Sequence, residues 1–458
     1  MPSTPSSGAP RRAERRRQRM TVSPPTTPLA AVVLGLLLGA AAAAPFWQSG
    51  PIVFGLAVVS LLYALMNGPA ARVHWTVLAF VAWSGVTFLW AETPSESLRA
   101  ILTLLTATVA VTFLVGQLTR AQVYRALATA LKVLIALSWL LYFGLPGSGR
   151  EQESYHHGAF TGIFIQRNTG AFVLGAAVLT FLFMATHPEL PRRRSSAVWA
   201  AVAFAALVAA ESGTGLAVTV VSSVVMLVVM RIRLWPSYVR QTLSVLAVLT
   251  VAGLLVQLQN VVAFVSGLLG RDDTLTGRTL IWASLRPYLD DRPWLGWGWG
   301  SLWTSHSVIT RAMWSVAHFE FPHAHNAYLD ARMQSGFIGL TLLMLVCAGI
   351  LLRSGRRLVA GEDGAWPVFP TVMTLFLLLY GIDEQAFMSV IGLLILVTCS
   401  ALVPSAGSPP RGPRHPRRRR GVGSVRGPVD RVRDRAEEDL PREALLEHRP
   451  RPSRRPRQ

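Results

Sequence analysis

Two histidines and an amide lie close together in segment 323–326 of the chain. Asn326 is a favoured residue at the start of a helix, so it predicts a helix that runs through Tyr328. His325 would then lie at the N-terminus of that helix, where the helix dipole disfavours a protonated ring. A neutral ring can accept a proton from a hydroxyl, and the same helix end attracts an anion such as pyrophosphate. We therefore predict that His325 is a base beside a bound anion, with His323 either orienting the acceptor or incidental.

Other interpretations of the two histidines stay open at this point. An isolated histidine is more often structural than catalytic. A zinc site is a lesser alternative, because no third and fourth ligands stand at a recognisable spacing. The only two cysteines, Cys347 and Cys399, lie in apolar runs and give no metal signature. We expect neither a metal nor a cofactor.

Two arginines have a position from which they could bind a phosphate. Arg278 falls in the first turn of a predicted amphipathic helix, where it would share an anion with free backbone N–H groups. Its alternative role is contact with solvent or lipid phosphate. Arg167 lies at the end of an apolar run, where binding a phosphate and interfacial snorkelling are equally good interpretations. The apolar residues that recur at helical spacing after Arg278 are Leu280, Ile281, Leu285 and Leu289.

Six of the fourteen tryptophans fall in residues 258–335. Tryptophan faces stack on the apolar faces of sugars, and they also anchor loops at a lipid interface. Trp282, Trp297 and Trp299, together with Asn326, are our candidates for binding substrate. Alternating glycines in segment 293–300 predict a turn that aims the tryptophans beside them.

Composition shows what must carry these residues. The chain has 458 residues, of which 51% are hydrophobic and only 15% are charged, and its mean hydropathy is +0.40. Several apolar runs approach the ~20 residues that cross a bilayer. We predict an all-α polytopic membrane protein with about twelve spans, near 28–45, 51–66, 74–91, 98–117, 126–145, 169–186, 197–210, 213–230, 241–257, 336–352, 365–381 and 387–403.

The net charge of +20 is concentrated in two tails. Residues 1–27 carry six arginines against one glutamate, and residues 404–458 carry sixteen against seven acidic residues. Such tails beside membrane spans fix topology and contact membrane lipids. They lack the aromatic residues that stack on bases, so we expect no nucleic-acid partner. We predict two disordered basic tails around one transmembrane domain at 28–403.

Arginine placement predicts which connections face the cytoplasm. Connections that contain arginine alternate with short connections that contain none, as the positive-inside rule requires. An even number of spans then puts both termini in the cytoplasm, with the protein in the cell membrane. Two longer loops, 146–168 and 258–335, fall outside, and the second, with short helices, holds most of the candidate residues. Arg99, at the outer end of a span, is the exception.

Several ordered motifs between about residues 155 and 350 resemble the O-antigen ligase and polymerase family of bacterial envelope glycosyltransferases. Segment 270–282, with Gly-Arg-Asp-Asp-Thr-Leu-Thr-Gly-Arg-Thr-x-x-Trp, looks like the branch associated with exopolysaccharide polymerisation. Pro-x-Leu-Gly-x-Gly-x-Gly at 293–300, His-Asn-x-Tyr-Leu at 325–329 and Gly-Phe-Ile-Gly-Leu at 336–340 continue the pattern in order. Gln334 departs from it, because many members carry Glu there, and Arg332 stands at a commonly apolar position.

The resemblance implies a helical membrane fold of the glycosyltransferase-C type. It implies metal-independent transfer of a glycan from an undecaprenyl-pyrophosphate-linked donor to an acceptor hydroxyl, on a glycan or another molecule, outside the cytoplasmic membrane. The family's essential histidine would correspond to His325. Its essential arginines would correspond to Arg278 and Arg167.

Two other functions compete with this interpretation. A lipid-linked glycan transporter or flippase would place ionisable groups at mid-membrane. Here Lys132 is the clearest such group, with His74 and Arg99 near span ends, while most polar residues lie in the loops. A peptidoglycan-type polymerase uses related lipid donors, so only substrate tests would separate it.

Overall fold

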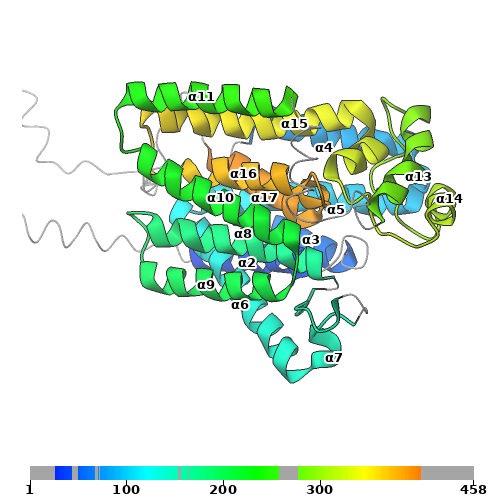
Figure 1. The fold of residues 1–458 in the computed structure, drawn as a ribbon, viewed down its shortest axis with the longest axis horizontal. Coiled ribbons are helices and arrows are strands. Elements are labelled where there is room, and N and C mark those ends of the chain that lie inside the picture. The colour runs from blue at the N-terminus through cyan, green and yellow to red at the C-terminus, as the bar shows by residue number, and fades with distance from the viewer. Residues whose placement is uncertain are drawn as a thin grey trace, which may run out of the picture. The chain divides into compact units, whose positions relative to one another are not determined.

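The computed structural model describes residues 26–43, 50–67, 71, 73–152, 156–164, 166–256 and 277–403. Among these residues the secondary structure is helical, apart from one isolated bridge between Arg150 and Phe160 (Figure 1). Both basic tails, residues 1–25 and 404–458, and segment 270–276 of the first motif lie outside the described residues. The helices are α2 (Thr26–Ala43), α3 (Gly50–Asn67), α4 (Trp75–Val86), η1 (Thr87–Trp90), α5 (Pro94–Gln117), α6 (Arg120–Gly144), α7 (Pro146–Gly149), α8 (Arg167–Thr186), α9 (Arg193–Ala209), α10 (Gly213–Ile232), α11 (Ser237–Val256), α13 (Arg278–Asp291), α14 (Val308–Ala317), α15 (Ala327–Ala360), α16 (Val368–Tyr380), η3 (Ala386–Met388) and α17 (Val390–Leu402).

The predicted all-α class is confirmed for the described residues, and each predicted span coincides with a helix. Five of these helices, α5, α6, α8, α10 and α15, are long and apolar enough to cross a membrane by length and composition. Shorter apolar helices lie within α2, α3, α16 and α17 and across α4 and η1. The chain is therefore a multi-pass membrane protein, while the number of twelve spans stays a prediction.

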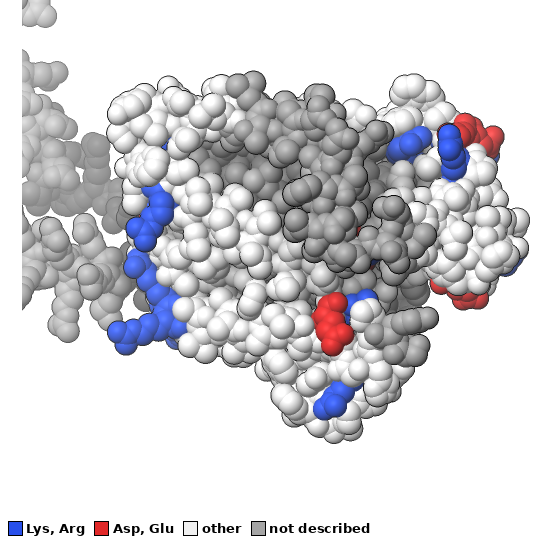
Figure 2. Space-filling model, viewed as in Figure 1, with Lys and Arg blue, Asp and Glu red and all other residues white. Residues whose placement is uncertain are grey.

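The connections between helices gather at two ends of the described helices. At one end, which we call the arginine end, Arg120 and Arg357 contact Asp363, and Arg240 donates to the carbonyl of Val359. In Figure 2, Lys and Arg side chains line one end of the helices, and the visible acidic side chains lie away from it. The predicted alternation of connections agrees with this separation.

At the other end, which we call the site end, the short connections contact residues of the 258–335 loop. The backbone N–H of Glu92 donates to the carbonyl of Trp297 at 3.1 Å, and the N–H of Thr93 donates to Ser301 Oγ at 2.8 Å. The carboxylate of Glu92 accepts from the N–H of Val308 at 2.7 Å. These bonds hold the described part of the loop, residues 277–335, against the helix ends.

Helix α15 changes direction at Gly336, whose backbone is not helical (φ 66°, ψ −172°). A positive φ of this kind favours glycine. The predicted span that begins at 336 thus corresponds to the second part of α15, and the part at 327–335 is a separate turn of helix that starts beside His325. The kink separates the residues that cross the apolar region from those that position the histidines.

The predicted glycine-rich turn at 293–300 packs directly on this kink. The N–H of Trp297 donates to the carbonyl of Met333 at 2.8 Å, and the N–H of Phe337 donates to the carbonyl of Pro293, also at 2.8 Å. A Cβ added to Gly296 would lie 2.6 Å from the backbone nitrogen of Gly336, so only glycine permits this approach. Gly296 thus serves packing between the loop and α15, while Gly298 packs against Ala91 and Gly300 against Ala100 of α5.

Candidate active site

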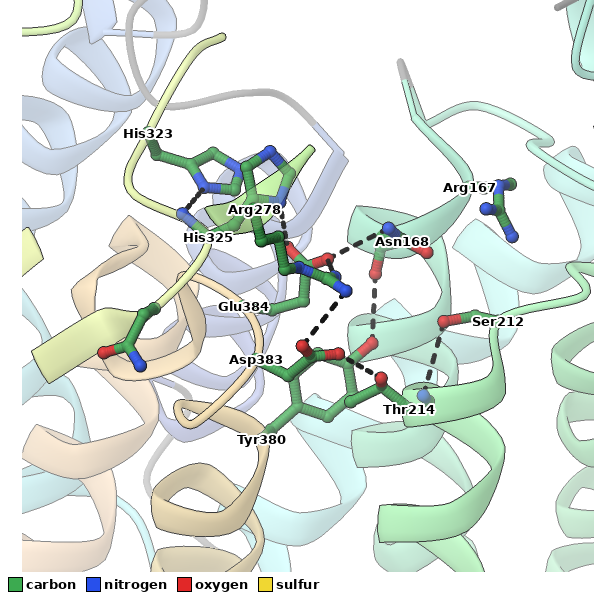
Figure 3. Close-up of polar contacts among 12 residues, drawn as sticks. Arg167, Asn168, Ser212, Thr214, Arg278, His323, His325, Tyr380, Asp383 and Glu384 are labelled. Atoms are coloured by element: carbon green, nitrogen blue, oxygen red, sulfur yellow. Dashed lines mark hydrogen bonds and ion pairs between the residues drawn. The ribbon is translucent and has the colours of Figure 1, made fainter. Parts of the chain in front are cut away.

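Arg278 lies between two carboxylates that come from far along the chain (Figure 3). It is the first residue of α13, and its guanidinium reaches Asp383 Oδ1 at 3.1 Å and Glu384 Oε1 at 2.9 Å. The two acidic residues stand in the short connection after α16. All three side chains are mostly buried, which makes the contacts stronger than they would be in water.

Glu384 is the residue on which the cluster converges. Besides Arg278, its Oε1 accepts a hydrogen bond from Asn168 Nδ2 at 2.9 Å, and its side chain is only 7% exposed. Burial alone would raise the pKa of this carboxyl. The close contact and charge of His325 and the charges of His323 and Arg278 outweigh burial and lower the pKa to about 2. Glu384 is therefore ionised at neutral pH.

His325 stands on the other side of Glu384. Its Nδ1 lies 3.4 Å from Glu384 Oε2, an ion-pair distance that falls short of hydrogen-bond geometry. A carboxylate facing Nδ1 favours a proton there and leaves Nε2 as the acceptor, the arrangement that a general base needs. The backbone of His325 has φ 47°, a left-handed conformation that non-glycine residues seldom adopt and that often marks a functional site.

Asn326 fixes the position of His325, as the sequence predicts. Its Oδ1 accepts from the backbone N–H groups of Tyr328 and Leu329, both at 3.0 Å, so Asn326 is the N-cap of α15. Its Nδ2 donates to the carbonyl of Ile382 at 2.8 Å. This second bond ties the start of α15 to the connection that carries the two carboxylates. Asn326 therefore fixes the position of His325 relative to the two acidic residues.

His323 is buried and supports the loop from within. Its Nδ1 accepts from the backbone N–H of His325 at 3.1 Å, and the two rings are 4.1 Å apart. Burial, helped by His325, lowers the pKa of His323 to about 3. A neutral ring whose Nδ1 accepts a hydrogen bond carries its proton on Nε2. This geometry assigns His323 to shaping the loop around His325.

A second set of polar groups braces the carboxylates. Thr214, in the first turn of α10, donates from its hydroxyl to Asp383 Oδ2. Tyr380, the last residue of α16, donates from its hydroxyl to the carbonyl of Asn168 at 3.1 Å. Ser212 caps α10 by accepting from the N–H of Gly215. The short Ser-Gly-Thr-Gly turn thus lines the same site.

Other predicted site residues lie outside the cluster. Arg167 begins α8 beside Asn168, but its Nη1 donates to the carbonyl of Glu211 at 2.8 Å, and Figure 3 shows it apart from the bonded network. Trp282 is close to the site, because its Nε1 donates to the carbonyl of Ala324 at 3.0 Å. It braces the histidine loop through that bond.

Two of the candidate tryptophans occupy positions unlike those expected of sugar-binding residues. Trp299 is fully buried against Phe80, so its ring has no face open to a substrate, contrary to the expectation from sequence. Trp297 donates from Nε1 to the carbonyl of Tyr288, and the guanidinium of Arg292 lies 4.1 Å from its ring centre. Both rings therefore contact other residues of the protein, and the turn directs them toward its interior.

Sequence analysis missed Asp383, Glu384 and Asn168 as site residues. The signal present was a pair of adjacent acidic residues in a short connection between two strongly apolar runs, 368–380 and 390–402. That connection contains no arginine, so the sequence alone indicates only its place in the topology. The departure at Gln334 is also explained. Gln334 Nε2 donates to Asp330 and its Oε1 accepts from the N–H of Gly300, so it is a structural residue.

The structure supplies a third potential metal ligand that the sequence did not show. His323, His325 and Glu384 place one donor atom each within 4.8 Å of one another. His325 Nδ1 has no hydrogen-bond partner, but existing bonds at the other two residues and the neighbouring guanidinium make the group fit a cation poorly. His323 Nδ1 is occupied by the N–H of His325, and Glu384 Oε1 accepts from both Asn168 and Arg278. The guanidinium, 2.9 Å from that carboxylate, would also repel a dication.

The comparisons with known proteins agree with the resemblance seen in the sequence. Residues 197–344 match the family model described as O-antigen ligase. The chain carries an O-antigen ligase segment. Over 328 residues it is also 26% identical to the exopolysaccharide production protein ExoQ of Rhizobium meliloti (strain 1021). The aligned residues cover 67% of this chain and 71% of that protein. The resemblance predicted from the motifs is confirmed over these residues.

The O-antigen ligase segment holds only part of the cluster. Thr214, Arg278 and His325 lie within residues 197–344. Asn168 precedes the matched residues, and Asp383 and Glu384 follow them. The site is therefore assembled from helices on both sides of the segment.

Proposed function

We propose that this protein transfers a glycan from an undecaprenyl-pyrophosphate carrier to an acceptor hydroxyl on the outer side of the cytoplasmic membrane. The family match and the exopolysaccharide-production relative support a surface-polysaccharide ligase or polymerase. The observation that carries the finer proposal is the contact of Arg278 and His325 with one buried carboxylate, Glu384, at the site end. A phosphate-binding cation and a base thus lie on opposite sides of one residue.

In the proposed reaction, the acceptor oxygen attacks the anomeric carbon of the donor sugar. The bond between that carbon and the phosphate oxygen breaks, and the pyrophosphate leaves with the electron pair. His325 takes the acceptor proton at Nε2, and Glu384 stabilises the ring as it becomes charged. Arg278 neutralises negative charge that develops on the leaving pyrophosphate.

Charge balance suggests how the pyrophosphate reaches Arg278. One guanidinium faces two carboxylates, so the cluster without substrate has no excess positive charge. Asp383 is the more exposed of the two, at 18% against 7% for Glu384. We infer that the pyrophosphate replaces Asp383 beside Arg278, while Glu384 stays with His325.

We further propose that transfer needs no metal, that the chain crosses the membrane twelve times, and that both termini are cytoplasmic. The poor fit of the histidines and Glu384 to a cation supports the first point. The gathering of Arg120, Arg240 and Arg357 at one end supports the orientation. Residues 258–335 would then face outward with the site. Chelation with EDTA should leave the transfer rate unchanged.

Replacement of His325 by alanine tests the assignment directly. We expect His325→Ala to lower glycan transfer in membrane vesicles by roughly 10²- to 10⁴-fold, because the acceptor proton loses its base. His306→Ala is a matched control, since His306 is an exposed histidine of the same loop. Transfer by His325→Ala at the wild-type rate, with the protein folded, would disprove the proposed role.

A further inference from the structure

A second feature of the site end is a cavity of about 320 Å³ beside the catalytic cluster. This volume is at the lower end of the range of about 300–1,000 Å³ that holds small-molecule ligands. The cavity lies between the first turns of α3 and α5 and the loop segment 300–304. Its lining residues are mostly apolar: Pro51, Phe54, Glu96, Arg99, Ala100, Leu102, Thr103, Gly300, Leu302, Trp303, Thr304, Pro322, Gln385 and Val390.

The cavity adjoins the cluster through two consecutive pairs of residues. Pro322 lines the cavity and directly precedes His323, and Gln385 lines it and directly follows Glu384. Neighbouring residues have Cα atoms about 3.8 Å apart. A ligand in the cavity therefore lies next in the chain to the buried carboxylate Glu384 and to His323, whose Nδ1 accepts from the backbone N–H of the base His325.

One wall of the cavity belongs to the surface that faces lipid. Leu102 lines the cavity, yet it is 41% exposed on α5. Leu98 and Leu105 on the same helix are also exposed, as is Leu62 on the neighbouring α3. Large exposed apolar side chains on helices of a membrane protein contact acyl chains. The cavity can thus be reached from the bilayer.

Polar groups in the lining are partly used within the protein. Trp303 Nε1 donates to Asp330 Oδ1 at 2.7 Å, and the hydroxyl of Thr103 donates to the carbonyl of Arg99 at 2.8 Å. A sugar needs many free donors and acceptors around its hydroxyls. A hydrocarbon needs none, so the mostly apolar lining favours an apolar ligand, although the buried hydroxyl of Thr304 has no hydrogen-bond partner.

Arg99 gives the mouth of the cavity a positive charge. Its side chain is 74% exposed, and its ion pair with Glu96 at 3.1 Å is a surface contact between residues one helical turn apart. Such pairs contribute little, so the guanidinium is able to turn to another anion. Guanidinium groups suit phosphate oxygens. This role also accounts for an arginine at a helix end where the charge pattern predicts none.

We propose that this cavity binds the prenyl units nearest the pyrophosphate of the lipid carrier, with Arg99 contacting a phosphate at its mouth. The proposal rests on the proposed function and names the place of the donor's lipid part. The cavity is too small for a whole polyprenyl chain, so the remainder lies along α3 and α5 in the bilayer. Lateral access through the wall at Leu102 lets the carrier arrive without leaving the membrane.

Binding of farnesyl pyrophosphate and of inorganic pyrophosphate to the purified full chain in detergent tests this proposal. Leu102→Trp narrows the cavity from its exposed rim. We expect it to weaken farnesyl pyrophosphate binding by roughly tenfold, because a prenyl unit loses its buried surface. Inorganic pyrophosphate binding should stay unchanged. Leu105→Trp is the control, since Leu105 is similarly exposed on α5 but does not line the cavity.

Ala100→Phe fills the cavity from its inner wall and should repeat the result, with melting temperatures confirming that each variant is folded. Unchanged farnesyl pyrophosphate affinity in folded Leu102→Trp would overturn the proposal. A rise in KM for the acceptor, with normal farnesyl pyrophosphate binding, would make the cavity an acceptor site and would also overturn it. Neither result touches the proposed function, whose test is the transfer rate of His325→Ala.

Discussion

Two clusters of arginine and carboxylate lie at opposite ends of the helices, and their compositions are reversed. At the arginine end, Arg120 and Arg357 both contact Asp363, at 3.2 and 2.5 Å. At the site end, Arg278 alone contacts two carboxylates. The first cluster has excess positive charge and no histidine within its ion pairs. The second has excess negative charge and faces two histidines.

The two clusters also differ in the space beside them. The cavity at the Asp363 cluster has a volume of about 10 Å³, too little for a ligand, against about 320 Å³ beside the site. Asp363 joins the start of α6 to the turn after α15, so its contacts tie two connections together. Buried ion pairs alone therefore do not mark function in this protein. The histidines, the carboxylate excess and the adjoining space do.

Glu384→Gln should have the largest effect and should separate the two clusters. The amide keeps the shape of the side chain but loses the charge that orients and stabilises His325. We expect glycan transfer in vesicles to fall by about 10²-fold or more. Asp363→Asn, the equivalent change at the arginine end, should transfer glycan near the wild-type rate. Equal loss in both variants would remove the distinction between the clusters.

Asp363→Asn should instead lower stability. Two arginines would lose their charged partner, which we expect to reduce the unfolding free energy by about 1–3 kcal/mol. The measurement is the thermal melting of the purified protein in detergent, followed by loss of helix signal. Arg356→Gln, which removes an arginine outside these ion pairs, serves as the control. A melting temperature unchanged from wild type would mean that the Asp363 contacts contribute nothing.

The smallest effect concerns pH, and it again differs between the ends. The pKa of His323 is about 3 in the folded state and near 6.5 when unfolded, so stability is complete above pH 6.5 and falls as the pH drops toward 3. We expect a loss of about 1 kcal/mol for each pH unit below 6.5. His323→Gln should remove the His323 contribution to this slope between about pH 6.5 and 5, while the lowered pKa of His187 and the raised pKa of Asp330 still contribute.

Asp363 supplies the contrast in that titration. Burial would raise its pKa, but the hydrogen bonds and charges of Arg120 and Arg357 lower it below the ordinary 3.8. Its contribution to stability is thus present above pH 3.8 and is lost only in stronger acid. Asp363→Asn should keep the wild-type slope between pH 6.5 and 5. If Asp363→Asn removed that slope, the loss of stability in acid would arise at the arginine end, which would contradict its assignment to His323.

Sequence reasoning succeeded where the signal was local. The cap at Asn326, the helix that starts at Arg278, the all-α class and the presence of a helix at each predicted span depend on residues within a few turns of one another. Even there one detail was wrong. Leu280 is 50% exposed, whereas Ile281 and the later apolar residues of α13 are buried, so the buried face is narrower than the pattern indicated.

The rest depends on tertiary packing that the sequence does not display. Glu384 meets Arg278 across 106 positions of sequence, and no local pattern links the two. Trp299 turns inward because the glycines on either side adopt positive φ values, 105° at Gly298 and 66° at Gly300. The number of tryptophans in the loop predicted sugar binding or interfacial anchoring. The path of the backbone decides which of their rings can face a substrate.

The kink at Gly336 has a mechanical consequence. The turn at 293–300 holds the backbone on both sides of it, through the carbonyl of Met333 and the N–H of Phe337. A helix that adjusts its tilt to a thicker or thinner bilayer therefore pivots about this point. The short arm that ends at His325 lies beyond the pivot and is fastened separately by Asn326. We expect the geometry of the base to be insulated from changes in membrane thickness.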